Sequence, residues 1–271
     1  MSMHRISGSL YFPQVEGLGT TYEAYITSEF LDRFIKEQAV QTVCEYPMCT
    51  FRVPGAIGAM LARKGCDVSL ATTDEDALRK AEALCTEYGV RRNVQFSRIG
   101  FDRLQSNSFD LVFHISVLPT MTRDLGMDPF ECISEMSRIS RRYVIITNHN
   151  LSYSVLLDRM LSFMMRKPSQ FGETYLVGVI PVRHMLRRLG LEIQEEFTFD
   201  MPPWMATDLS RAVPTIRAYG IRGLAGCNAT TIDSIMRKYA FIERSSLPRF
   251  LKALHAHHVA LIAEKPTRDS P

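Results

Sequence analysis

The chain contains 271 residues with a mass of 30.9 kDa, of which 46% are hydrophobic and 23% are charged. This composition is typical of a globular protein with a sizeable core, and it excludes fibrous and low-complexity chains. The formal net charge is only +3, and Lys and Arg are spread along the whole chain. Binding to a phosphate backbone normally requires a concentrated basic patch, so the sequence gives no sign of a nucleic-acid partner.

The cysteines indicate a reducing compartment. None of the six forms a Cys-x-x-Cys pair, and no His lies at zinc-ligand spacing from them. Most lie within apolar runs, where a free Cys packs as a small hydrophobe. We therefore expect neither a disulfide framework nor a metal site. The N-terminus lacks a signal-peptide pattern and no apolar run is long enough to span a membrane, so we expect a cytoplasmic protein.

Strands and helices are expected to alternate along most of the chain. Residues 1–20 have the composition of an irregular arm. Helical periodicity and end signals predict helices at 21–38, 55–65, 73–89, 128–140, 179–190 and 246–255. Short β-rich runs predict strands at 40–46, 66–72, 94–96, 108–118, 142–147, 191–199 and 257–266. Alternation of this kind, with continuously apolar strands, indicates an α/β fold in which helices cover both faces of a parallel sheet.

Two stretches, 150–178 and 200–245, interrupt this alternation and are rich in Met, Leu and Tyr. We expect them to form an apolar helical cap over the carboxyl edge of the sheet, within a single domain that spans 1–271. The Met-rich segment 151–167 is either a helix packed on the core or a flexible lid or partner surface. In the second case, homo- or hetero-oligomers would form through the cap.

Several strings resemble the class I S-adenosylmethionine (SAM)-dependent methyltransferases. LARKGCDVSLATTDEDALRKAEAL (61–84) is similar to the second strand–helix unit of that family. NSFDLVFHISVL (107–118) is similar to its fourth strand, and EMSRISRRYVIIT (135–147) to the helix and fifth strand that follow. The resemblance covers about 21–200 and the final strand. It implies a doubly wound, seven-stranded, mostly parallel Rossmann-like sheet of order 3-2-1-4-5-7-6, whose last strand is antiparallel.

The turn after the first strand departs from the family pattern. The family usually has E/D-x-G-x-G-x-G there, because glycines let the backbone approach the cofactor. This chain has EYPMCTFRVPG at 45–55, in which Glu45 keeps the acidic position and Pro47, Cys49 and Phe51 stand in place of turn glycines. Pro54 suits the first position of the next helix, followed by Gly55 in a different kind of turn.

The resemblance implies SAM as the cofactor. The implied binding residues are Glu45, Tyr46, Pro47, Gly55, Thr72, Thr73, Asp74, Gly100, Phe101, Asp102 and His114. The family carboxylate that binds the ribose aligns with Thr72, and the one beside the adenine aligns with Gly100. Asp74 and Asp102 lie two residues further on in each case, so either they substitute or the cofactor does not bind. Asp74 is alternatively a simple N-cap of the following helix.

Polar residues near the ends of the fourth and fifth strands are candidates for chemistry. Ligands of open α/β sheets bind outside the carboxyl ends of the strands, so His114 and His149 are candidate general bases. The candidate substrate contacts are Asn148, Asn150, Tyr153 and Trp204. The alternatives are a buried core histidine, loop capping by the polar residues and a purely structural turn at the tryptophan. Asp110, at the start of the fourth strand, is expected to be structural.

The function implied by the resemblance is SAM-dependent methyl transfer to a small, partly apolar molecule. The missing glycines and carboxylates favour an alternative, in which the chain is a non-catalytic methyltransferase-like binding or regulatory subunit. A dinucleotide-dependent oxidoreductase is disfavoured, because no G-x-G-x-x-G follows the first strand.

Overall fold

The computed structural model describes residues 4–6, 9–11, 18–48, 53–99, 103–115, 126–149, 160, 163–164, 179–199, 229–256 and 258–266. The chain divides into two compact units. The first, called the sheet unit below, comprises 32–149, 175–197 and 259–271. The second, called the helical unit, comprises 1–31, 150–174 and 198–258.

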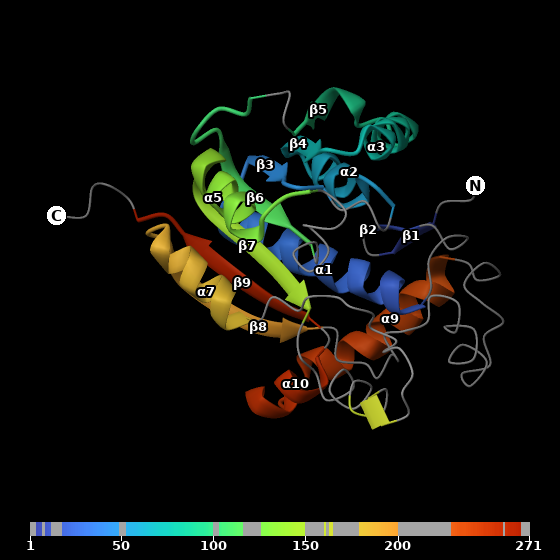
Figure 1. The fold of residues 1–271 in the computed structure, drawn as a ribbon. Helices are drawn as coiled ribbons and strands as arrows, with labels where there is room; N and C mark the ends of the chain where they lie inside the picture. Colours follow the sequence, from blue (N-terminus) through green and yellow to red (C-terminus); the bar gives the residue numbers. More distant parts are fainter. Residues whose placement is uncertain are drawn as a thin grey trace. The chain divides into compact units, whose positions relative to one another are not determined.

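A seven-stranded sheet organises the sheet unit (Figure 1). Its strands are β3 (Thr42–Glu45), β4 (Asp67–Thr72), β5 (Val94–Arg98), β6 (Phe109–His114), β7 (Ser140–His149), β8 (Glu192–Phe199) and β9 (His258–Glu264). They lie in the order β5-β4-β3-β6-β7-β9-β8, so the predicted order is confirmed. The five strands from β5 to β7 pair in parallel.

The last strand runs in the opposite direction to its neighbours. Just past the end of β9, the Lys265 amide donates to the Arg142 carbonyl at 2.8 Å, near the start of β7. At the other end, the His258 ring that opens β9 stacks on Phe199, which closes β8. The end of β9 therefore lies beside the start of β7, and the start of β9 lies beside the end of β8. This confirms the antiparallel final strand.

Helices connect the parallel strands as the sequence predicts. They are α2 (Ala56–Arg63), α3 (Glu75–Glu87), the short 3₁₀ turn η1 (Arg91–Asn93), α5 (Pro129–Ile139) and α7 (Val179–Arg188). α2 and α3 pack on β4 and β5, whereas α5 packs on β6 and β7. The core of this unit is apolar, with Met136, Val144 and Leu261 in one buried cluster. Among the described helices, none is long and apolar enough to cross a bilayer.

The helical unit contains a short hairpin and three helices. β1 (His4–Ile6) pairs antiparallel with β2 (Ser9–Tyr11), so the expectation of an irregular arm at 1–20 is wrong. The unit also holds most of α1 (Leu18–Glu37), together with α9 (Ala229–Arg244) and α10 (Arg249–His255). α9 packs on β1. Most of the two stretches assigned to the cap lies outside the described residues, so the cap remains a prediction.

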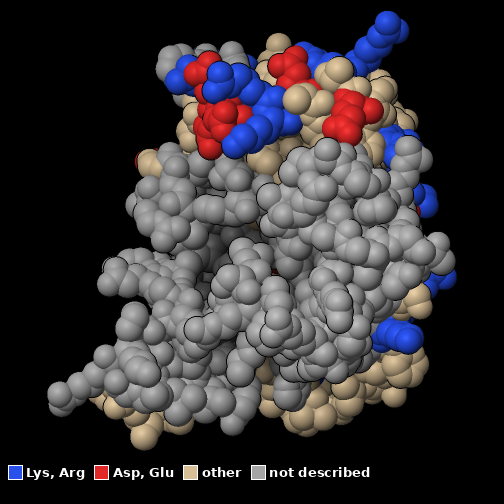
Figure 2. Space-filling view, turned by 90° about the vertical axis from the view of Figure 1, so that its right-hand side faces the viewer, with Lys and Arg blue, Asp and Glu red and all other residues tan. Residues whose placement is uncertain are grey.

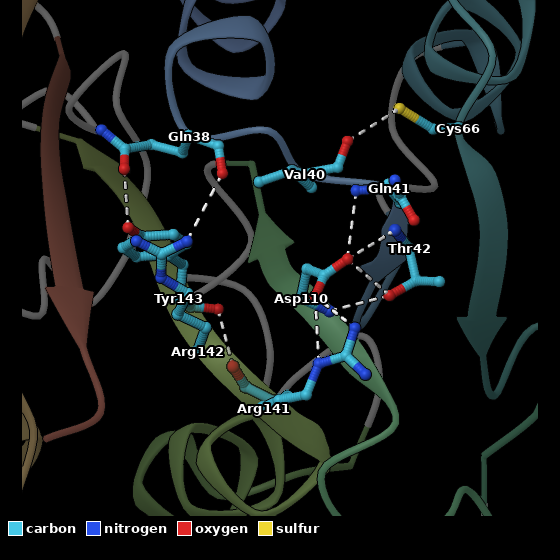
Figure 3. Close-up of polar contacts among 10 residues, drawn as sticks. Gln38, Val40, Gln41, Thr42, Cys66, Asp110, Arg141, Arg142 and Tyr143 are labelled. Atoms are coloured by element: carbon cyan, nitrogen blue, oxygen red, sulfur yellow. Dashed lines mark hydrogen bonds and ion pairs between the residues drawn. The ribbon is translucent and has the colours of Figure 1, made fainter. Parts of the chain in front are cut away.

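The amino ends of the central strands are joined by a carboxylate (Figure 3). Asp110 in β6 accepts hydrogen bonds from the backbone amides of Gln41 and Thr42, both at 3.0 Å, and from the Thr42 hydroxyl at 3.1 Å. Arg141 at the start of β7 donates to its other oxygen. One side chain thus holds three neighbouring strands in register, which agrees with the structural role expected for Asp110.

Candidate functional site

Buried polar side chains gather at the carboxyl ends of the parallel strands. Glu45, Thr72 and His114 are the last residues of β3, β4 and β6, and Asn148 is next to last in β7. Each is at most 2% exposed. The register places Glu45 opposite Phe113, the neighbour of His114, and opposite Leu70, two residues before Thr72. The strand ends therefore bring together residues that lie far apart in the sequence.

Glu45 is a buried carboxylate. Its exposure of 2% is unusual for an acidic side chain, because burial of a charge is costly unless another charge or several donors offset it. Burial raises the pKa of the preceding Cys44 thiol, and the negative charge of Glu45 raises it further. Its place at the carboxyl end of a parallel strand makes Glu45 a candidate ligand group.

The segment after β3 is fastened to both neighbouring strands. The Tyr46 amide donates to the Phe113 carbonyl of β6 at 2.9 Å, and the Met48 amide donates to the Ala71 carbonyl of β4 at 2.6 Å. The Tyr46–Pro47 peptide is cis, and none of residues 46–48 has a positive φ. This part of the turn therefore does not require glycine. Met48 is fully buried, and burial raises the pKa of Tyr46. Residues 49–52 lie outside the described residues.

Gly55 is the glycine that this turn does require. It has a φ of 75° and is the N-cap of α2. A Cβ at this position would lie 2.6 Å from the Ala81 Cβ on α3 and 3.1 Å from a Leu70 methyl on β4. The prediction of Pro54 at the first helical position is wrong, because helical geometry begins only at Ala56, after the left-handed Gly55.

Thr72 and Asp74 connect β4 to α3. The Thr72 hydroxyl accepts a hydrogen bond from the Asp74 amide at 3.3 Å. Asp74 is the N-cap of α3 and accepts bonds from the amides of Asp76 and Ala77, at 2.9 and 3.0 Å, through the same oxygen, Oδ1. Its Oδ2 has no hydrogen-bond partner among the described residues, and the side chain is exposed. The helix-capping role is therefore real, yet one carboxylate oxygen remains available to a ligand.

His114 is fully buried, and neither ring nitrogen has a hydrogen-bond partner within the described part of the chain. Burial lowers its pKa to about 3, so the ring is neutral at physiological pH. A neutral imidazole can donate and accept hydrogen bonds, but with this pKa it is a weak base. The nearby Thr147 hydroxyl donates to the His114 carbonyl at 3.3 Å, a neighbour that the sequence did not single out.

The structure places Asn148 and His149 differently from the prediction. Asn148 and His149 were expected to follow the fifth strand, but they form its last two residues, because β7 continues to His149. Asn148 is 1% exposed. The other candidates, Gly100, Phe101, Asp102, Asn150, Tyr153 and Trp204, lie outside the described residues. Within the described ranges, no group of three or more His, Cys, Asp or Glu side chains could hold a metal ion.

Comparison with known proteins gives structural likeness alone. No family model matches the sequence, and no curated protein matches it. A sarcosine dimethylglycine methyltransferase from Galdieria sulphuraria, itself described as putative, superposes with a TM-score of 0.58 at 13% identity, covering 97% of this chain and 94% of the other. Magnesium protoporphyrin IX methyltransferase from Synechocystis gives 0.55 at 12%, covering 89% and 82%. The chain has the methyltransferase fold.

The same comparison also finds a different activity on this fold. The cyclase SpnF superposes with a TM-score of 0.52 at 14% identity, covering 89% of this chain and 81% of the other. Fold alone therefore does not fix the reaction, which must be argued from the residues at the carboxyl edge of the sheet.

Proposed function

We propose that this protein is a SAM-dependent methyltransferase that acts on a small, partly apolar molecule. The observation that carries the proposal is the set of buried polar side chains at the carboxyl edge, above all Glu45 and His114. Ligands of open α/β sheets bind at this edge. The neighbour from Synechocystis supports the choice of cofactor, because it was solved with S-adenosylhomocysteine (SAH) bound.

The residues present fit this cofactor. Glu45, buried at the end of β3, would accept hydrogen bonds from the cofactor ammonium. Oδ2 of Asp74 would accept a ribose hydroxyl while Oδ1 keeps capping α3. This division of one carboxylate offsets the loss of the family acid at Thr72. When bound, SAM supplies an electrophilic methyl group.

On the acceptor side, the protein has mainly to orient the substrate and exclude water. His114 would hydrogen-bond the acceptor as a neutral ring, since burial lowers its pKa to about 3. If the acceptor needs a base, His149 at the end of β7 is the candidate. Asn148, Asn150, Tyr153 and Trp204 would contact the substrate. A cytoplasmic location and association through the Met-rich cap also remain proposals.

A second candidate function has its own support. Pro47 stands where the family has a turn glycine, with the fully buried Met48 beside it, and Thr72 stands where the family has a ribose acid. The fold could therefore serve a non-catalytic binding or regulatory subunit. The two candidates differ in a simple way. An enzyme must bind both SAM and its product SAH, whereas a subunit that has lost the cofactor binds neither.

Calorimetric titration tests the proposal. The full chain is titrated with SAM, with SAH and with NAD, and we expect heat from the first two only. Glu45→Gln should weaken SAM binding about tenfold to a hundredfold, the effect of losing a hydrogen bond to a charged partner. Glu264→Gln is the matched control, because Glu264 pairs with Arg142 at the opposite edge of the sheet and should leave binding unchanged.

Two results would reject parts of this scheme. If neither SAM nor SAH binds, the methyltransferase proposal fails and the non-catalytic subunit replaces it. If both bind but Glu45→Gln has no effect, the cofactor occupies the fold in a different way and the role given to Glu45 is wrong.

A further inference from the structure

Exposed large apolar side chains are concentrated in the helical unit. Seven of them belong to it, each at least 45% exposed: Met160, Phe163, Met164, Phe241, Leu247, Phe250 and Leu254. Among the described residues of the sheet unit, Ile180 is the single counterpart. Scattered apolar residues are normal on protein surfaces, but a concentration of Phe, Met and Leu in one unit indicates a surface that meets another apolar phase.

α9 presents an outward stripe with apolar and basic character. Arg237, Lys238 and Phe241 are exposed, and they recur at helical spacing, whereas Met236 and Ala240 on the other side are fully buried. Phe241 is 75% exposed and does not share the buried face of the helix. The stripe is therefore the outer surface of a helix that is already anchored by its opposite side.

α10 continues this surface. Phe250 is 65% exposed and Leu254 is 48% exposed, with the exposed Arg249 beside them. The Lys252 ammonium donates to the Glu243 carbonyl at 2.7 Å, which ties α10 to the last turn of α9. The two helices thus form one supported corner, called the α9–α10 corner below.

The corner is basic. Residues 229–256 contain five Lys or Arg residues and two acidic ones. Arg244 pairs with Glu29 of α1, so the positive excess comes from the other four basic residues, Lys238 and Arg249 among them. Elsewhere the surface is different: at the top of the face in Figure 2, where α3 lies, blue and red side chains alternate. There Asp76 pairs with both Arg79 and Lys80, and Glu82 pairs with Arg91. The excess of positive charge near exposed Phe and Leu is therefore a local property of the corner.

We propose that the α9–α10 corner docks on an anionic lipid surface. Exposed Phe and Leu would insert at the boundary between headgroups and acyl chains, while Lys238 and Arg249 would face the anionic headgroups. A second copy of this chain fits less well, because two basic corners would repel each other. A nucleic acid would use the charges but would gain little from the aliphatic Leu247 and Leu254. The proposal does not depend on methyl transfer.

Vesicle co-sedimentation tests this proposal with the full chain. The protein should sediment with vesicles of phosphatidylcholine mixed with phosphatidylserine, and much less with phosphatidylcholine alone. Lys238→Glu with Arg249→Glu should reduce binding to the mixed vesicles about tenfold or more. Phe241→Ser with Phe250→Ser should reduce it by a similar factor, because inserted apolar area is lost.

Matched controls keep the test decisive. Ile180→Ser removes an equally exposed apolar side chain from the sheet unit, and Arg92→Glu with Arg187→Glu reverses two exposed charges there. Both controls should sediment like the unmodified chain, and circular dichroism should show that all variants fold. Equal binding to both vesicle types, or no binding to either, would overturn the proposal. A dimer in light scattering that the two Phe substitutions abolish would identify a second copy as the partner instead.

Discussion

The two ends of the parallel strands use buried polar groups in opposite ways. At the amino ends, Asp110 receives donors from Gln41, Thr42 and Arg141, so its carboxylate is satisfied within the chain. At the carboxyl ends, the ring nitrogens of His114 have no hydrogen-bond partner among the described residues. Both residues belong to β6, four positions apart. One strand therefore carries a structural group at its start and a group suited to a ligand at its end.

The pKa values express the same difference. Burial tends to raise the pKa of Asp110, but its hydrogen bonds from Thr42, Arg141 and Gln41 outweigh this and hold it at about 2. For His114 the pKa falls to about 3 through burial alone. The first group is stabilised in its charged form by the fold, and the second is kept neutral because the fold offers it no compensation. A buried polar group without a hydrogen-bond partner in the folded chain is suited to form a hydrogen bond with a ligand.

The largest expected effect is at the amino ends. Asp110→Ala should lower the free energy of unfolding by about 3 kcal/mol, because two backbone amides, a hydroxyl and a guanidinium lose their acceptor. Asp110→Asn, which keeps one acceptor oxygen, should cost about half as much. Urea denaturation measures both. SAM affinity of the folded protein should be unchanged, and a loss of binding at equal folding would break the separation between the two ends.

The carboxyl ends also contain one structural position, Gly55. Gly55→Ala should lower the free energy of unfolding by about 2–3 kcal/mol, because the new Cβ meets Ala81 and the left-handed backbone is strained as well. Gly190 has the same φ of 75° but nothing within 4 Å of its would-be Cβ, so Gly190→Ala should cost only about 1 kcal/mol. If both variants lose the same free energy of unfolding, α2 can move away from α3, and the close approach of Gly55 to Ala81 is not fixed.

A smaller effect should appear in the pH dependence of stability. Below the unfolded pKa of about 6.5, the unfolded chain binds a proton at His114, while the folded chain does not until about pH 3. Stability should therefore fall between pH 7 and pH 5 by about 2 kcal/mol from this residue. Asp110 adds nothing in this window, because its titration lies below about pH 4. His114→Gln should flatten the dependence in urea denaturation, whereas His184→Gln, at an exposed position on α7, should not.

Local patterns explain why the sheet could be predicted from the sequence. The buried runs of β3, β4 and β6 and the Gly that follows α2 are signals within single segments, and the resemblance supplied the strand order. The hairpin of β1 and β2 was missed because three-residue strands leave almost no pattern. α9 lies within the helical cap predicted at 200–245, but its bounds were not predicted because that stretch was considered only for its apolar content. The helical spacing of Ile232, Met236 and Ala240 could have revealed it.

The site was predictable where it depends on strand ends and not where it depends on contacts. Glu45, Thr72 and His114 were expected at strand ends and are the last residues of β3, β4 and β6, although the runs predicted for the first and fourth strands continued to 46 and 118. The complete burial of Met48 could not be foreseen, since it depends on hydrogen bonds to strands that lie on either side in space. The sequence also could not show that only Oδ1 of Asp74 caps α3, while Oδ2 does not.

Substitution of Asp74 should have the smallest effect on stability. It tests whether a structural group at the carboxyl ends of the strands also binds the ligand. Asp74→Asn should change the free energy of unfolding by less than about 0.5 kcal/mol, because Asn and Asp are equally good N-caps. SAM affinity should nevertheless fall about threefold to tenfold, since an amide cannot replace the charge of Oδ2 toward a ribose hydroxyl. Asp128 caps α5 in the same way, accepting from the amides of Phe130 and Glu131, so Asp128→Asn is the matched control. If both variants bind SAM like the unmodified chain, Asp74 is a helix cap and nothing more, and the ribose contact must come from Thr72 or Thr73.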